Sequence, residues 1–307
     1  MLEHVGYIDL PPHAKPGGFD HAAVHRRTRR VYVAHTANDA VDVVDSVSGR
    51  LVGTVPGLPG VAGALVNEEQ DLVFTSNRAE NTIGVFPTSA PGSVAKVRVG
   101  LRPNGLAYDP ARHRLLAANV GDATIPHSFT VSIVDVRTRT MVGDCPVPGR
   151  TRWTVYDPAA DVFHVNIAEP PLIAVIDASD PLGTMRLVAV PSAGPHGLDI
   201  DVTARRLFCA CDGGRLVELD ADRGVILRGA DLQGVPDVVF FNPALKRLYI
   251  AVGDPGVIEV FDTPTLRRAQ TVTTEKGAHT LAFDAEADTV YAFLPASHRA
   301  AVYFDQP

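Results

Sequence analysis

Polar and titratable side chains occupy one position of a phrase that returns seven times along the chain. The phrase reads "FDHAAVH" at its first occurrence (19–25) and "PHGLDID" at its fifth (195–201). Equivalent positions of a repeat take equivalent places in the fold, so we expect the variable second residues to converge. We call these seven residues the mouth ring: Asp20, Ala62, Asn104, Arg152, His196, Asp237 and His279.

Two histidines and two aspartates of the mouth ring come from neighbouring repeats. Imidazole nitrogens with carboxylates are the ligand set of zinc, manganese or iron, and carboxylates also bind calcium. The sequence therefore predicts a divalent metal site made by His196, His279, Asp237 and Asp20. No nucleotide cofactor is expected and no haem, since the chain has no CxxCH motif for covalent haem.

A metal at this position would support hydrolysis. Metal-bound water ionises near neutral pH and could attack a lactone or ester, while Arg152 stabilises the oxyanion. We expect His35 and Glu169, from neighbouring loops, to transfer protons. The same groups suit proton abstraction next to a carbonyl, so a lyase reaction remains open.

The third repeat carries extra residues in the loop "NVGDATIPHSFT" (119–130). Insertions collect on the binding face of repeat proteins, and loops carry function more often than the scaffold does. We therefore predict that His127 of this loop contacts the substrate, together with Asn104 and Trp153. The alternatives are a neutral insertion and, for Trp153, packing between repeats.

The mouth ring also has a structural interpretation. Polar residues that precede a strand often satisfy the backbone groups of adjacent turns. Asp237 in "VPDVVF" suits a turn on these grounds alone. Four such side chains in neighbouring repeats are harder to explain in this way than one, so both interpretations remain open.

Short alternating strands follow each phrase. A second strand, such as "RVYVAH" or "RLFCAC", comes next, and a third strand ends in an acidic turn at six of the seven repeats, with Pro87 in the remaining one. The mouth-ring residues are 41 to 48 residues apart, and four short strands in such a period are typical of a β-propeller blade. No amphipathic helix fits between the strands, which excludes a parallel α/β fold.

The seventh repeat has only three strands before the chain ends. The N-terminal segment "HVGYIDLP" (4–11) matches the fourth strands of other repeats and could complete it. Ring closure of this kind removes a free sheet edge. The sequence thus predicts one all-β domain over residues 1–307, a seven-bladed propeller with four-stranded antiparallel blades, whose last blade combines about 278–307 with 4–11.

The strands "RVYVAH", "LVFTSN" and "VFHVN", with entries of the "P-x-G-L" type, resemble the YVTN repeat of bacterial and archaeal seven-bladed propellers. The resemblance covers the whole chain. It implies the propeller fold and says little about chemistry, because the repeated residues are those that pack sheets. Related propellers include lactonases and lyases, as well as surface-layer and periplasmic proteins.

Composition narrows the function classes. The 307 residues carry a net charge of −7, which argues against a nucleic-acid partner, because phosphate-backbone binding needs a basic face. Three cysteines and the lack of a signal-peptide pattern or membrane-length apolar run favour a cytoplasmic protein without a membrane partner. We therefore expect a small-molecule enzyme with its site in the central funnel; a propeller scaffold that binds a ligand or a protein without catalysis is the alternative.

Overall fold

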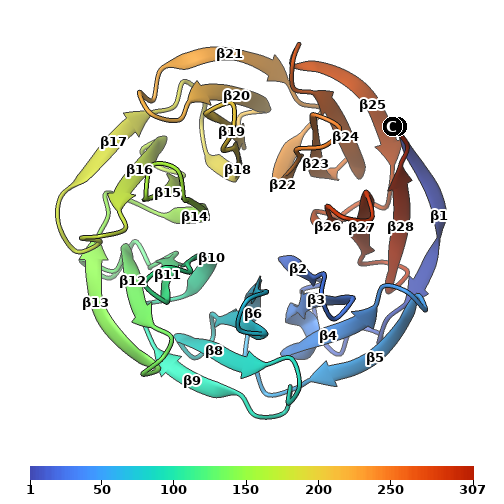
Figure 1. Cartoon of the computed structure of the whole chain (residues 1–307), viewed down its shortest axis with the longest axis horizontal. Coiled ribbons are helices and arrows are strands. Elements are labelled where there is room, and N and C mark those ends of the chain that lie inside the picture. Colours follow the sequence, from blue (N-terminus) through green and yellow to red (C-terminus); the bar gives the residue numbers. More distant parts are fainter.

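The computed structural model describes all 307 residues as a closed ring of seven four-stranded antiparallel sheets (Figure 1). Each sheet is one blade, and its first strand lines the central channel. The prediction of an all-β seven-bladed propeller is confirmed. The single helix is a 3-10 turn, η1 (Thr36–Asn38), and no helix has the length and apolarity needed to cross a membrane.

The strands of the first four blades lie in chain order from the central channel to the outer edge. Blade 1 contains β2 (Ala22–His25), β3 (Arg30–His35), β4 (Ala40–Asp45) and β5 (Arg50–Val55). Blade 2 contains β6 (Val61–Asn67), β7 (Leu72–Asn77), β8 (Thr82–Pro87) and β9 (Ala95–Arg98). Blade 3 contains β10 (Pro103–Asp109), β11 (Arg114–Asn119), β12 (Thr130–Asp135) and β13 (Thr140–Pro146). Blade 4 contains β14 (Thr151–Asp157), β15 (Val162–Ile167), β16 (Leu172–Asp177) and β17 (Met185–Ala189).

The remaining blades repeat this order. Blade 5 contains β18 (Pro195–Asp201), β19 (Arg206–Cys211), β20 (Arg215–Asp220) and β21 (Ile226–Asp231). Blade 6 contains β22 (Val235–Asn242), β23 (Arg247–Asp254), β24 (Val257–Asp262) and β25 (Arg267–Thr273). Blade 7 contains β26 (Thr280–Asp284), β27 (Thr289–Leu294), β28 (Arg299–Asp305) and, as its outer strand, β1 (Leu2–Asp9).

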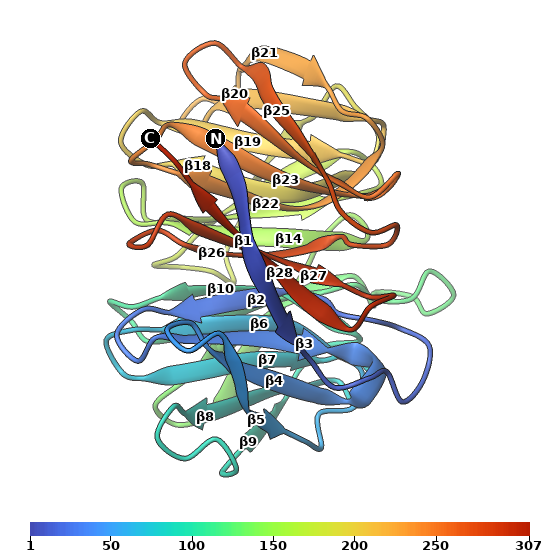
Figure 2. The same ribbon diagram turned by 90° about the vertical axis from the view of Figure 1, so that its right-hand side faces the viewer.

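Strand β1 closes the ring by pairing with β28 from Leu2–Asp305 to Asp9–Arg299, and the two strands run side by side in Figure 2. The terminal ammonium of Met1 also lies 2.7 Å from the Asp305 carboxylate. Closure by the N-terminal strand is thus confirmed, with the strand two residues earlier than the predicted 4–11. The strand ends before Pro11, which has no N–H to continue a ladder.

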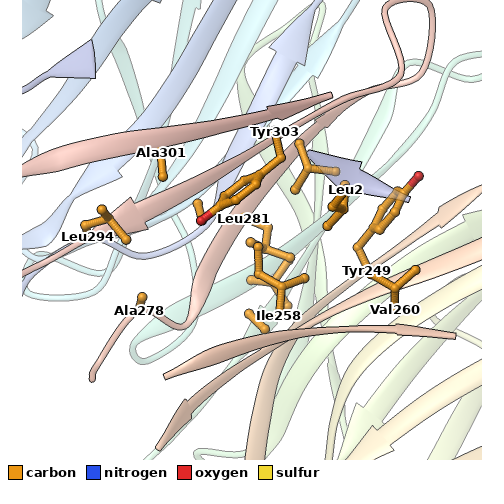
Figure 3. Close-up of a cluster of buried hydrophobic side chains, with 13 residues drawn as sticks. Leu2, Tyr249, Ile258, Val260, Ala278, Leu281, Leu294, Ala301 and Tyr303 are labelled. Atoms are coloured by element: carbon orange, nitrogen blue, oxygen red, sulfur yellow. The ribbon is translucent and has the colours of Figure 1, made fainter. Parts of the chain in front are cut away.

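The core lies between neighbouring blades, where the faces of adjacent sheets pack together. Figure 3 shows one such cluster, in which Leu2, Ile258 and Tyr303 join blades 6 and 7. Tyr249 lies in the same cluster and donates its hydroxyl to Asp305 at 2.6 Å. This packing holds the inner strands in fixed positions around the channel.

The acidic turns stabilise the outer hairpins of the blades. Asp45 accepts the N–H groups of Val47 and Ser48 at 3.0 and 2.7 Å, and Asp135 and Asp220 accept in the same way. These aspartates therefore satisfy the backbone N–H groups of the turns that follow the third strands.

Candidate functional site

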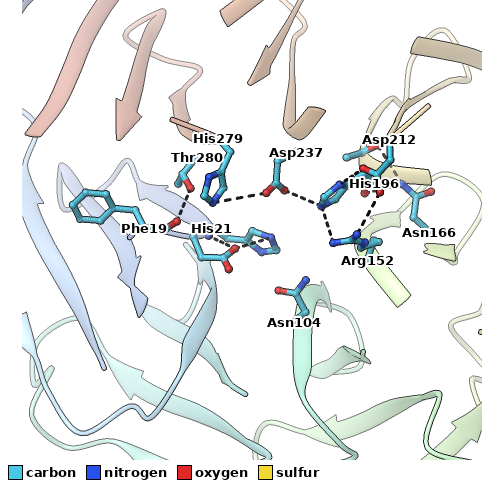
Figure 4. Close-up of polar contacts among 12 residues, drawn as sticks. Phe19, His21, Asn104, Arg152, Asn166, His196, Asp212, Asp237, His279 and Thr280 are labelled. Atoms are coloured by element: carbon cyan, nitrogen blue, oxygen red, sulfur yellow. Dashed lines mark hydrogen bonds and ion pairs between the residues drawn. The ribbon is translucent and has the colours of Figure 1, made fainter. Parts of the chain in front are cut away.

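The mouth ring converges on a small polar cavity at one end of the channel, which we call the upper chamber. The chamber has a volume of about 210 Å³. Six of the seven mouth-ring residues line it: Asp20, Asn104, Arg152, His196, Asp237 and His279. Figure 4 shows five of them pointing toward one another: Asn104, Arg152, His196, Asp237 and His279.

His196 makes three polar contacts in this chamber. Its Nδ1 lies 2.6 Å from Oδ1 of Asp212, its Nε2 lies 3.3 Å from Nη1 of Arg152, and the same Nε2 lies 3.3 Å from Oδ1 of Asp237. A carboxylate only accepts and a guanidinium only donates, so the pairing with Asp212 and Arg152 requires a proton on Nδ1 and a lone pair on Nε2. The imidazole is therefore held in the tautomer of a general base that faces the chamber.

The backbone around His196 is fixed from both sides. Nδ2 of Asn166 donates to the carbonyls of His196 and Gly197, at 2.9 and 3.2 Å. A Cβ atom at position 197 would lie 2.1 Å from the carbonyl oxygen of Asp237. Only glycine therefore lets β18 approach β22 closely enough for His196 and Asp237 to meet.

Asp237 lies between two histidines. Its Oδ1 is buried without a hydrogen-bond partner, and its Oδ2 lies 3.9 Å from Nε2 of His279. Burial works to raise the pKa of this carboxyl, but the neighbouring imidazoles and the Arg152 guanidinium together outweigh burial and lower the pKa. Asp237 is thus a partly buried carboxylate aimed at His196 with unused acceptor capacity.

Four guanidinium groups give the upper chamber an excess of positive charge: Arg78, Arg102, Arg150 and Arg152, against the lining carboxylates of Asp20 and Asp237. Arg78 donates to Oδ1 of Asn104 at 2.5 Å and lies 3.3 Å from Asp20. Desolvation and repulsion by the neighbouring guanidiniums lower the pKa of Arg150. An anion in the chamber would relieve this repulsion and pair with the same groups.

His21 lines the floor of the upper chamber, and Trp153 lies against it on the side of a larger cavity in the channel. The two rings lie 4.1 Å apart between centroids. The indole of Trp153 also meets Phe240 edge to face at 6.3 Å and packs on core clusters on both sides of the channel. A side chain of blade 4 thus crosses the channel to reach blades 1 and 6.

Three residues predicted from the sequence lie elsewhere. His35 is fully buried inside blade 1, where Nδ1 contacts Asp42 at 2.6 Å and Nε2 contacts Nδ1 of His13 at 2.8 Å. Glu169 is exposed in the turn between β15 and β16, and His127 is exposed in the blade 3 loop. None of these three residues lines the upper chamber, and neither does Trp153, which lines the larger cavity of the channel.

The sequence prediction missed Asp212 and three of the four arginines. Asp212 directly follows the end of β19, next to the pair of buried cysteines. Arg102 and Arg150 stand two residues before the mouth ring, where four other repeats carry glycine: Gly18, Gly60, Gly194 and Gly277. This departure from the repeat was a usable signal.

The predicted metal ligands form a partial set. His196, Asp237 and His279 lie in a row, whereas Asp20 turns toward Arg78 and His21. No group of three or more His, Cys, Asp or Glu side chains has the geometry to hold a metal ion. A guanidinium also occupies the side of His196 that a metal would approach, so the present arrangement fits a metal poorly.

Fold and site together define a seven-bladed β-propeller with a charged chamber at one end of its channel. No protein-family model and no curated protein sequence matches the chain. The fold is similar to that of Kuenenia stuttgartiensis hydrazine synthase, with a TM-score of 0.81 and 14% identity over 95% of this chain and 96% of that one. It is also similar to a chain of the mitotic checkpoint complex, with a TM-score of 0.84 and 10% identity over 99% and 92%. Likeness at these identities establishes the propeller fold alone.

Proposed function

We propose that the upper chamber is the active site of a general acid–base enzyme for a small organic anion. The proposal is carried by the position of His196 Nε2, 3.3 Å from a guanidinium and 3.3 Å from a carboxylate. Neutral imidazole accepts a hydrogen bond from Arg152, and imidazolium donates one to Asp237. Both protonation states of His196 therefore have a partner, as a base that takes and returns a proton requires.

The charge and size of the chamber favour a small carboxylate or phosphate. Guanidinium groups bind these planar or tetrahedral anions through paired hydrogen bonds. A volume of about 210 Å³ is below the range of drug-sized sites, which is about 300–1,000 Å³. The substrate therefore has the size of a simple organic acid.

Two reactions use the same residues. His196 takes a proton either from water, which then attacks a lactone or ester carbonyl, or from the carbon next to a carboxylate, which starts a lyase reaction. In both cases negative charge develops on an oxygen of the substrate. Arg152 lies next to the base and can stabilise that charge.

A divalent metal is the second candidate for the chamber. The observation in its favour is that Nε2 of both His196 and His279 faces the carboxylate of Asp237. The four arginines on the same wall favour an anion instead, because they repel a cation.

A binding propeller without catalysis remains the alternative to an enzyme, and the partly buried His196–Asp212 pair favours the enzyme. We keep the assignment to the YVTN-repeat propellers as part of the proposal. It is supported by the strand phrases and by the count of seven four-stranded blades.

The test begins with anion binding. Calorimetry with citrate, glucuronate and inorganic phosphate should show binding that weakens by at least about tenfold in Arg152→Gln, because one charged hydrogen-bond donor is lost. Asp231→Asn, an exposed change on outer strand β21, is the control and should bind like the wild type. If none of the three anions binds, the proposal is wrong.

Turnover is then measured with a panel of lactones and uronate-type substrates. Asp212→Asn should lower kcat by at least about 100-fold with little change in KM, because asparagine no longer holds His196 in the base tautomer. Products distinguish hydrolysis from elimination. Anion binding without any turnover would support the non-catalytic alternative.

A further inference from the structure

A second, larger cavity occupies the rest of the channel, and we call it the lower chamber. Its volume is about 590 Å³, and it extends from the His21–Trp153 pair to the turns that follow the inner strands, at Glu68, Pro110 and Pro158. The volume lies within the range of sites for small organic ligands, about 300–1,000 Å³. The proposed function uses none of this space.

The wall of the lower chamber is mostly apolar and rich in aromatic rings. Its aromatic side chains come from four blades: Tyr108, Trp153, Tyr156, Phe240 and Phe283. Phe240 lies 6.3 Å from Trp153 and 6.4 Å from Phe283, between ring centroids. Exposed aromatic faces attract organic cations through the negative potential of the ring.

Asp199 is the one carboxylate that an inner strand contributes to this wall, whereas Glu68 and Glu69 lie at its far end, in the turn after β6. Asp199 stands at the fifth position of the repeated phrase, where the six other blades carry only apolar residues: Ala23, Leu65, Ala107, Val155, Phe240 and Ala282. The six other blades pack without a charge at this position, so the repeat itself does not require one.

Asp199 is anchored but has no counter-ion. Its carboxylate accepts the N–H of Ile200 at 2.8 Å and the N–H of Phe241 at 2.6 Å. No lysine or arginine lines the chamber. Burial raises the pKa of the Asp199 carboxyl to about 7, although the two N–H groups favour the charged form.

We infer that the lower chamber binds an apolar molecule that carries one protonated amine, with the ammonium against Asp199 and the apolar part against the aromatic wall. The ammonium supplies the missing counter-charge, and its N–H groups use the remaining lone pairs of the carboxylate. The aromatic rings favour the same cation and also bury the rest of the ligand. A carboxylic acid ligand is disfavoured, because two carboxylates would meet without a cation between them.

The experiment compares three probes of nearly equal shape: 2-phenylethylamine, 2-phenylethanol and 3-phenylpropionate. Trp153 is the single tryptophan of the chain and lines the chamber, so its fluorescence reports binding there directly. At roughly pH 8 the amine should bind at least about tenfold more tightly than the alcohol, as expected for a charge-assisted hydrogen bond, and the propionate should bind most weakly. Equal binding of amine and alcohol would overturn the inference.

The variant Asp199→Asn should bind the amine and the alcohol equally well, whereas the control Asp231→Asn should keep the preference for the amine. Retention of that preference in Asp199→Asn would also overturn the inference. If Asp199→Asn does not fold, the wild type provides the same test, because protonation of Asp199 near pH 5 should remove the preference that it shows near pH 8.

Discussion

Replacement of Asp199 by asparagine should change how the stability of the protein depends on pH. Burial raises the pKa of this carboxyl from 3.8 to about 7, so the folded protein holds the proton up to a higher pH than the unfolded chain does. The free energy of unfolding that depends on Asp199 is therefore fully present below the unfolded pKa and is lost as the pH rises through about 7. Asparagine does not ionise, and the variant lacks this loss.

The size of the effect follows from the two pKa values. One unit of pKa difference corresponds to about 1.4 kcal/mol, so the wild type should lose about 2.5 kcal/mol of unfolding free energy, relative to the variant, between roughly pH 5 and pH 8. Asparagine presents only one oxygen to the N–H groups of Ile200 and Phe241 and loses about 1 kcal/mol for the other bond. That loss is independent of pH, so the pH dependence isolates the ionisation of Asp199.

Urea unfolding followed by far-UV circular dichroism measures both quantities. Wild type, Asp199→Asn and the exposed control Asp231→Asn are unfolded near pH 5 and near pH 8, and the differences between variant and wild type are compared at the two pH values. For the control, the difference in unfolding free energy from the wild type should be the same at both pH values. If the difference for Asp199→Asn is also constant, the carboxyl ionises normally in the folded protein and the reasoning from burial is wrong.

Two further predictions concern the upper chamber. Gly197→Ala should lower the free energy of unfolding by about 2 kcal/mol or more, because the added methyl meets the carbonyl of Asp237. The control is Gly53→Ala, where the added atom contacts nothing within 4 Å. Equal thermal unfolding of the two variants would contradict the close approach of β18 and β22. Metal analysis of the purified protein distinguishes the two occupants proposed for the upper chamber, an anion and a divalent metal. If the chamber is an anion site, the desalted protein should contain no divalent metal. About one equivalent of metal per chain that disappears in His196→Ala/His279→Ala would establish the metal site instead.

The repeat made the fold and the position of the site predictable. A regular period with alternating strands fixes the blade, and a closed ring brings equivalent residues to one place, as His196 and Asp237 show. The seventh repeat has only three strands, and this gap identified the N-terminal segment as the closing strand β1. These inferences depend only on spacing, which a single sequence contains.

Which residues contact the mouth ring depends on the directions of side chains and on the paths of loops. The spacing of the repeats does not determine either of these. His35 is the last residue of β3, and its ring turns into the blade, where Asp42 meets it and where the link between β1 and β2 brings His13. Asp212 reaches His196 from a loop 16 residues further along the chain. Asp199 is different, because its departure from the apolar residues of the six other repeats is present in the sequence itself.

His21 lines both chambers of the channel, and its ring lies against Trp153, which lines the lower one. A ligand in either chamber would therefore rest close to the same pair of rings. The imidazole is tilted by 53° against the indole. This tilt is the natural quantity to follow when either chamber is filled, because a change in it would show that the two chambers are coupled.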